Sequence, residues 1–240
     1  MYFIANATGS RGEAFVGPEF LRVHCRMPSR FVVVSLVAIS ACKPAPPAVD
    51  PAFEPAATTV KTHLAMLPRI KQAIDTTPRL SADTLALPGG RKASATLITV
   101  DQLSSLGACF SDAPICDDFW WRLSRCEQLS QLTPAAASAQ FDAINEVKRC
   151  AGLRYLAVAR QRAFTQPTVD KASKTYRPGH LSVELLVFDL ETGASLGGFI
   201  VDAKSPASLD GMSAQTNVEK YLHTALGRIV FDAMRARIDT

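Results

Sequence analysis

The chain has 240 residues, 48% of them hydrophobic, which is enough apolar material for one main core and too little for several large domains. Its 26 basic and 22 acidic side chains give a net charge of +4. The first 41 residues hold four arginines and two glutamates, so residues 42–240 carry 26 − 4 = 22 basic and 22 − 2 = 20 acidic groups. This weak excess is not the footprint of a nucleic-acid-binding protein, and we expect no nucleic-acid partner.

One apolar run, residues 31–41, follows Arg26 and Arg30 and ends directly before Cys42. A transmembrane helix needs about 20 apolar residues, so this run is too short to span a bilayer. Its length, the preceding positive charges and the small residues at its end are typical of a signal peptide. The valine-rich run could also be a buried strand. The Pro-rich residues that follow Cys42 would leave such a strand nothing to pair with, which favours the signal peptide.

The sequence Ile39-Ser-Ala-Cys42 resembles the lipobox of bacterial lipoproteins, which is an aliphatic residue, a small residue, Ala or Gly, and cysteine. This resemblance implies cleavage between Ala41 and Cys42 and acylation of Cys42 with diacylglyceryl and palmitate chains. Several acyl chains make such an anchor effectively permanent. Lys43 differs from the Asp that resembles an inner-membrane retention signal, so we expect the protein at the periplasmic face of the outer membrane.

We predict four segments from this signal. Residues 1–26 are an unusually long extension, which we interpret as a start-site misannotation with translation beginning at Met27. Residues 27–41 are the signal peptide, and residues 42–59 are the lipidated cysteine and an extended Pro-rich tether. Residues 60–240 are predicted to form one periplasmic α/β domain.

The predicted domain begins with apolar residues at helical spacing from Val60 to Ile74, interrupted by Pro68. This pattern predicts a helix with a break. Residues 93–100 are β-branched and mostly apolar, which predicts a buried strand. A short helix capped by Asp101 is expected to follow.

Two further helices are predicted to form a helical hairpin. The first has Asp117 or Asp118 as its N-cap. The second has Thr133 as its N-cap, Pro134 in its first turn, and an end near Gly152. The hairpin is therefore centred near Thr133.

The pattern then changes to a period of two over residues 153–164, which predicts a strand buried in its middle. A polar loop is expected up to Gly179. Two strands flank residues 191–193, where Gly193 can supply the positive φ of a short hairpin. An amphipathic helix over residues 217–238 closes the chain. Its predicted buried stripe comprises Val218, Tyr221, Leu222, Ala225, Leu226, Ile229, Val230 and Ala233.

These elements predict an α/β fold, with a mixed sheet of about four strands on which the helical hairpin and the long C-terminal helix pack. Residues 153–238, with a hairpin turning through residues 189–193, resemble the α/β domain of envelope lipoproteins such as penicillin-binding-protein activators and the curli-secretion family. This resemblance implies a fold and carries no function.

The predicted domain holds four cysteines: Cys109, Cys116, Cys126 and Cys150. In an oxidising periplasm an even number predicts two disulfides, and the spacings lack the tight pairs of a zinc site. In a hairpin centred near Thr133, Cys116 faces Cys150, whereas Cys126 lies about 15 Å along the axis from Cys150. This geometry favours Cys116–Cys150 with Cys109–Cys126. Steeply crossing helices would instead pair Cys109 with Cys116 and Cys126 with Cys150.

Candidate catalytic groups are few. His63, His180 and His223 form no metal-binding or protease motif, and the sequence has no nucleophile elbow or phosphate-binding loop. We therefore expect no metal and no cofactor. Gly197-Gly198 within a strand indicates a bulge or a close approach of another backbone and not a ligand-binding loop.

A basic run surrounds the loop at residues 165–180 and is the candidate contact to an anionic envelope component or an acidic partner. Its members are Arg160, Arg162, Lys171, Lys174 and Arg177. Together these features predict a non-catalytic binding or assembly-accessory lipoprotein of the cell envelope. It would be held by membrane lipid through Cys42 and would contact an envelope protein or cell-wall component. The alternative is an envelope enzyme of unrecognised type, such as a hydrolase, which a deep pocket with converging acidic groups or histidines would favour.

Overall fold

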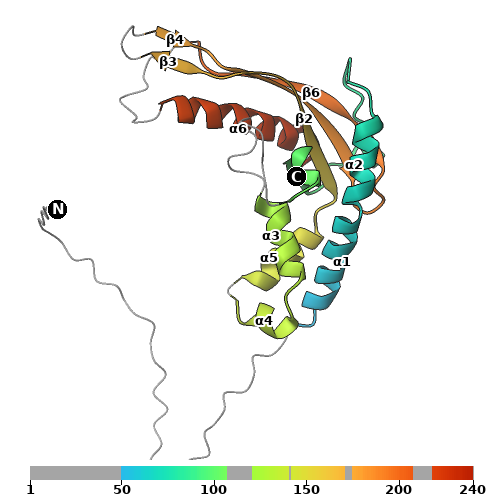
Figure 1. The fold of residues 1–240 in the computed structure, drawn as a ribbon. Coiled ribbons are helices and arrows are strands. Elements are labelled where there is room, and N and C mark those ends of the chain that lie inside the picture. Colours follow the sequence, from blue (N-terminus) through green and yellow to red (C-terminus); the bar gives the residue numbers. More distant parts are fainter. Residues whose placement is uncertain (1–49, 107–120, 141, 171–174, 208–217, 240) are drawn as a thin grey trace, which may run out of the picture. The chain divides into compact units, whose positions relative to one another are not determined.

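The computed structural model of the chain describes residues 50–106, 121–140, 142–170, 175–207 and 218–239. The described residues all belong to one compact unit within residues 45–240, whose elements Figure 1 labels. The signal peptide, the cleavage site at Ala41 and the proposed lipid site at Cys42 therefore lie outside the described residues. The elements are α1 (Phe53–Ala65), α2 (Leu67–Thr76), η1 (Pro88–Gly90), β1 (Ala95–Thr99), η2 (Asp101–Leu103), α3 (Trp121–Ser130), α4 (Pro134–Ser138), α5 (Ala143–Ala151), β2 (Tyr155–Thr165), β3 (Thr168–Asp170), β4 (Thr175–Arg177), β5 (His180–Asp189), β6 (Ser195–Lys204) and α6 (Val218–Ile238).

A four-stranded sheet with the order β1-β2-β5-β6 forms the centre of the fold. β1 runs parallel to β2, and β2, β5 and β6 pair as antiparallel neighbours. The predicted α/β class and the mixed sheet of about four strands are confirmed. The β5–β6 hairpin is also confirmed, and Gly193 in its turn has a φ of 67°.

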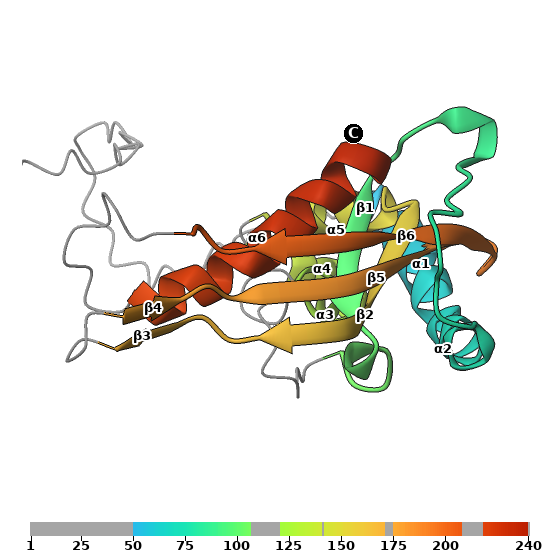
Figure 2. The same cartoon turned by 90° about the horizontal axis from the view of Figure 1, so that it is seen from above.

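The C-terminal helix α6 crosses one face of the sheet, as Figure 2 shows. Its fully buried residues are Leu222, Leu226, Val230, Met234 and Ile238. This regular spacing of four winds slowly around the helix, because four residues turn it by more than one full turn. The predicted stripe instead runs parallel to the helix axis. Tyr221 and Ile229, which it included, are exposed.

The opposite face of the sheet is covered by α2, which contributes Leu67, Ile70 and Ile74 to a second apolar core. α1 ends and α2 begins around Met66, so the predicted helix break is confirmed. Pro68 lies in the first turn of α2, where a missing backbone N–H leaves no helical hydrogen bond unmade.

The predicted tether is wrong over residues 53–59, because α1 begins at Phe53 and the domain therefore starts before residue 60. Phe53, Ala56 and Ala57 are buried and continue the apolar face of Val60 toward the N-terminus. Pro55 suggested an extended chain, but it lies in the first turn of α1, where proline is tolerated. The apolar spacing therefore decides the local structure.

The helical hairpin packs against α1, as Figure 1 shows. A third apolar core joins α1, α3 and α5 through residues such as Phe53, Leu129 and Val147. Thr133 caps α4 as predicted, since its Oγ1 accepts a hydrogen bond from the N–H of Ala136 at 3.2 Å.

The second helix of the hairpin is not continuous to Gly152 as predicted. α4 ends at Ser138, and α5 starts at Ala143 after Asp142, whose φ of 62° is left-handed. The connection between α3 and α5 therefore occupies residues 131–142, and the hairpin is not centred at Thr133.

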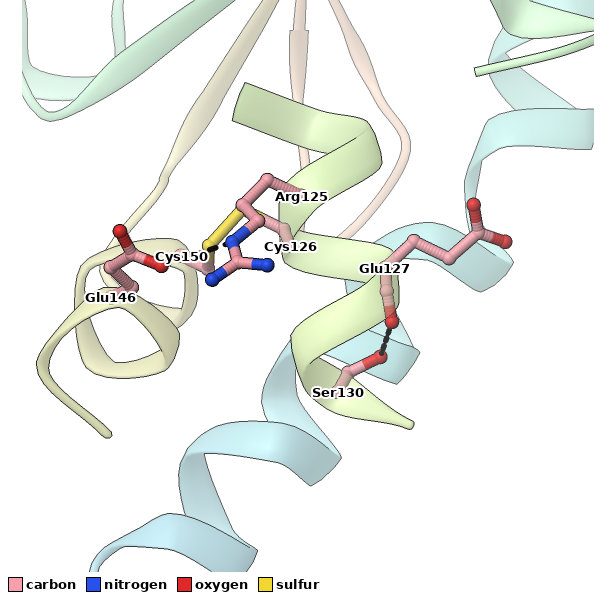
Figure 3. Close-up of a disulfide and its surroundings, with 6 residues drawn as sticks. All are labelled: Arg125, Cys126, Glu127, Ser130, Glu146 and Cys150. Atoms are coloured by element: carbon pink, nitrogen blue, oxygen red, sulfur yellow. Dashed lines mark hydrogen bonds and ion pairs between the residues drawn. A yellow bond between two sulfur atoms is a disulfide. The ribbon is translucent and has the colours of Figure 1, made fainter. Parts of the chain in front are cut away.

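A disulfide joins Cys126 of α3 to Cys150 of α5, with their Cα atoms 5.6 Å apart (Figure 3). The favoured pairing of Cys116 with Cys150, and of Cys109 with Cys126, is therefore wrong. The long connection moves the centre of the hairpin to the midpoint of residues 126 and 150, which is (126 + 150)/2 = 138. Cys109 and Cys116 lie outside the described residues.

Two smaller predictions also change. The polar loop expected before Gly179 contains a two-stranded sheet of β3 and β4, whose β-branched and aromatic residues Val169 and Tyr176 lie opposite each other. Asp101 is the first residue of the short helical turn η2, and Val100 occupies the N-cap position predicted for it. The side chain of Gln102 folds back onto the end of β1, where its Oε1 accepts a hydrogen bond from the N–H of Thr99 at 2.8 Å.

We expect the Cys126–Cys150 disulfide to stabilise the domain by about 3 kcal/mol, because it closes a loop across a sequence separation of 24 residues. The variant Cys126→Ala/Cys150→Ala should lower the free energy of urea unfolding by about that amount. Arg125→Gln is the matched control, since it removes a half-exposed ion pair with Glu146 beside the disulfide and should cost under about 1 kcal/mol. An unchanged urea midpoint for the double cysteine variant would contradict the expectation.

Candidate functional site

A cluster of charged side chains surrounds Glu184 in the middle of β5. The neighbours of Glu184 along the strand, Val183 and Leu185, face the core under α6, so Glu184 points to the opposite face of the sheet. Its side chain is 0% exposed. A carboxylate buried to this extent must be paired and hydrogen-bonded, because its loss of hydration is otherwise very unfavourable.

Arg160 lies directly opposite Glu184 on the neighbouring strand β2 and is its closest partner. The Nε and Nη2 atoms of Arg160 lie 2.7 Å and 2.6 Å from Oε2 of Glu184. Its Nη1 donates to the carbonyl oxygen of Thr77 at 2.7 Å, and Nη2 donates to that of Pro78 at 2.8 Å. With a side chain only 14% exposed, Arg160 is committed to these contacts.

Two more arginines and one backbone amide complete the surroundings of Glu184. The N–H of Leu80 donates to Oε1 at 3.0 Å. Nη1 of Arg79 lies 3.4 Å from Oε2, and Nε of Arg162 lies 3.9 Å from Oε1. Their side chains are 55% and 36% exposed, so both guanidinium groups reach the surface.

The partners of this cluster belong largely to one segment, residues 77–87, which we name the strap. It leaves the end of α2, passes over Glu184, and reaches the outer edge of β6. There the N–H of Thr84 donates to the carbonyl oxygen of Gly198 at 2.8 Å, and the N–H of Ala86 donates to that of Leu196 at 2.9 Å. The strap therefore extends the sheet by a short backbone pairing.

The glycine pair on β6 allows two close backbone approaches, Gly197 to the strap and Gly198 to the neighbouring strand β5. A Cβ atom at Gly197 would lie 2.2 Å from the carbonyl oxygen of Thr84, and one at Gly198 would lie 2.5 Å from that of Leu185. Gly197 also has a φ of 86°, which side chains disfavour. The predicted close backbone approach at Gly197-Gly198 is confirmed.

The strap is also attached to α6. Oδ2 of Asp83 lies 2.5 Å from Nη1 of Arg237, and this guanidinium holds the pKa of Asp83 below its ordinary value. The same arginine lies 4.5 Å from the ring centroid of Phe199, a distance typical of a cation–π contact. Polar groups therefore fasten the strap to β2, β5, β6 and α6.

The structure gives the predicted basic run several different roles. The prediction that Arg160 contacts an anionic partner is wrong, because its guanidinium group is buried and binds Glu184 and Thr77 within the fold. Arg162 is half exposed beside Glu184, and Arg177 is exposed on β4. Lys171 and Lys174 lie outside the described residues.

Sequence reasoning missed Glu184 and Arg79. A signal for Glu184 was present, because it is the one charged residue within the apolar run Leu181-Ser-Val-Glu-Leu-Leu-Val187. A charge at such a position requires a buried partner. Arg79 carries no comparable signal, since it belongs to a loop whose path depends on the folded sheet.

The same face continues to a second polar group around Asp202 on β6. Nε2 of His180 lies 3.5 Å from Oδ1 of Asp202. A hydrogen bond from Ser182 is the main cause that lowers the pKa of Asp202 below 3.8, and His180 and Arg162 lower it further. Asp202 thus stands between serine and histidine. In a catalytic triad the histidine stands between the other two, so this arrangement does not activate Ser182 as a nucleophile.

Within the described ranges, no group of three or more His, Cys, Asp or Glu side chains is placed to hold a metal ion. In the part of the chain that the structure describes, none of the helices combines the length and the apolar character needed to cross a membrane.

Comparisons with known proteins identify no family for this chain. No protein-family model matches it, and no curated protein matches it. A solved structure of the hypothetical protein CT253 from Chlamydia trachomatis shares 15% sequence identity with it. That match covers 48% of this chain and 69% of the other, with a TM-score of 0.24. So low a TM-score establishes neither a fold family nor a function.

We expect Glu184→Leu to destabilise the domain by about 3–5 kcal/mol, because it leaves Arg160 buried without its counter-charge. Glu184→Leu/Arg160→Leu should be more stable than the single variant, since it removes both charges. Asp202→Asn is the control on the same face, and its exposed carboxylate should contribute under about 1 kcal/mol. Urea unfolding measures all three. A wild-type midpoint for Glu184→Leu would show that the buried pair does not hold the strap.

Proposed function

We propose that this chain is the precursor of a membrane-anchored envelope lipoprotein whose domain acts as a non-catalytic binding or assembly-accessory module. The observation that carries the proposal is the order of features around Cys42. Two arginines, Arg26 and Arg30, precede the apolar run at residues 31–41, which ends at the lipobox and is followed by prolines. Each feature alone is common, but their sequence along the chain is that of a lipoprotein signal.

The position of α1 supports a short connection between the anchor and the domain. Ten residues, 43–52, separate Cys42 from Phe53, the first residue of α1. In a fully extended form they would span about 30–35 Å at most. The proposed lipoprotein therefore keeps its domain close to the membrane surface.

The Cys126–Cys150 disulfide supports the proposed compartment. Disulfides persist in oxidising compartments such as the bacterial periplasm and are rare in the cytosol. Both cysteines are buried between packed helices, which is typical of a structural bond. The periplasmic face of the outer membrane therefore remains the proposed location.

The exposed part of the charged cluster supports a binding role for the domain. Glu184 and Arg160 fasten the strap from within the fold. Arg79 and Arg162 keep half-exposed guanidinium groups next to them. Guanidinium forks at a surface suit carboxylate or phosphate groups, so the proposed partner is an acidic envelope protein or an anionic cell-wall component.

We expect the full chain, expressed in a bacterial host with labelled palmitate, to incorporate the label and to sediment with the outer membrane. Cys42→Ser should incorporate none and should accumulate as an uncleaved precursor. Cys126→Ala/Cys150→Ala is the control, since it removes two cysteines of the domain, far from the signal, and should leave labelling unchanged. Labelling of the Cys42→Ser variant, or an unlabelled wild-type protein, would refute the anchor.

We expect in-cell cross-linking followed by affinity purification to recover an acidic or anionic partner. Arg79→Gln/Arg162→Gln should reduce its yield about tenfold, which corresponds to about 1.4 kcal/mol for the loss of two surface charges. Arg91→Gln is the control, because Arg91 is exposed in the loop that follows η1. An equal yield from the cluster variant and the control variant would remove this surface from the proposal.

A further inference from the structure

His63 is a titratable side chain buried in the last turn of α1. It is 5% exposed, and its Nδ1 atom has no hydrogen-bond partner. Three residues later α1 ends at the break around Met66. A neutral imidazole can occupy this site with little loss, whereas a second proton on the ring would be poorly hydrated there.

The charged groups that act on His63 come from the end of the β5–β6 hairpin and the start of β2. They are Arg154 on the connection into β2, Asp189 at the end of β5, and Glu191 in the turn. Arg154 binds both carboxylates, and its Nη2 lies 2.6 Å from Oδ2 of Asp189. The two carboxylates are therefore already engaged with a cation.

The other helices packed on α1 offer little compensation for a proton on His63. On α3 and α5, Arg125 pairs with Glu146, and Lys148 pairs with Asp50 at the start of the described chain. Arg69 of α2 donates to the carbonyl oxygen of Thr192. α4 carries no charged residue. Glu127 on α3 is the remaining acidic side chain of that helix, and it is half-buried.

We propose that His63 makes the packing of α1 acid-sensitive, so that proton uptake at this buried position weakens the contact between α1 and the rest of the domain. The contact does not depend on the proposed lipid anchor. In the proposed lipoprotein, α1 is the first helix after the tether from Cys42. The module would then respond to acid in the compartment that the anchor assigns to it.

The direction of the effect follows from linkage. Burial is the main cause that lowers the pKa of His63 below 6.5; Arg154 lowers it further, while Glu191 and Asp189 oppose the shift. The unfolded chain therefore takes up a proton at a higher pH than the folded chain. The stabilisation is complete above pH 6.5 and is lost as the pH falls through and below that value. Each pH unit within this window can raise the unfolding equilibrium constant by at most about tenfold.

The experiment measures urea unfolding of the protein at pH 7.5, 6.5 and 5.5. The wild-type midpoint should fall over this range, and that of His63→Leu should stay nearly constant. His180→Gln is the matched control, because it removes a half-exposed histidine on another face and should keep the wild-type slope. The carboxylates with lowered pKa values, Asp50, Asp83 and Asp202, act below about pH 4 and do not confuse this window.

A second measurement covers the case in which His63→Leu does not fold. The ring-proton NMR signal of His63 in the wild-type protein should titrate with a midpoint below 6.5. Hydrogen exchange, corrected for its intrinsic pH dependence, should accelerate at pH 5.5 in peptides from α1 more than in peptides from α6. A midpoint at or above 6.5, or a wild-type slope in His63→Leu, would overturn the proposal.

Discussion

The buried carboxylate of Glu184 is the constraint on which the sheet face opposite α6 depends. Without partners, a charge at this depth would cost several kcal/mol. Its partners come from β2 and from the strap, so the same charge fixes the register of Arg160 opposite Glu184 and the path of the chain after α2. Gly197 on β6 then admits the strap backbone at Thr84. The side chain of Glu184 thus holds together three segments that are distant in sequence.

The strap also determines how the sheet ends. β6 is the last strand in the sheet order, and an open edge can pair with other chains. Thr84 and Ala86 occupy part of this edge with backbone hydrogen bonds. At the other edge, two backbone N–H groups of β1 donate to side chains, Ala95 to Asp239 and Thr99 to Gln102. These contacts protect the sheet against pairing from outside.

The sequence predicts those elements that depend on a local pattern of residues. The strands with a period of two, the hairpin at Gly193 and the long C-terminal helix follow from residues within a few positions of each other. The start of α1 at Phe53 was not predicted, because Pro55 suggests an extended chain unless it lies in the first turn of a helix. The role of Arg160 depends on residue 184, and the disulfide pairing depends on the length of the connection between two helices. Such features are set by tertiary contacts and leave no local pattern.

The parallel pairing of β1 with β2 gives the disulfide a consequence for the order of folding. The two strands are joined through residues 100–154, a loop of 154 − 99 = 55 residues. When Cys126 and Cys150 are oxidised, the covalent path bypasses residues 127–149 and shortens to 55 − 23 = 32 residues. Loop-closure entropy then falls by about 0.5 kcal/mol. Strand pairing would be favoured about twofold in the oxidised chain, so the compartment that forms the bond would also set how readily the sheet assembles.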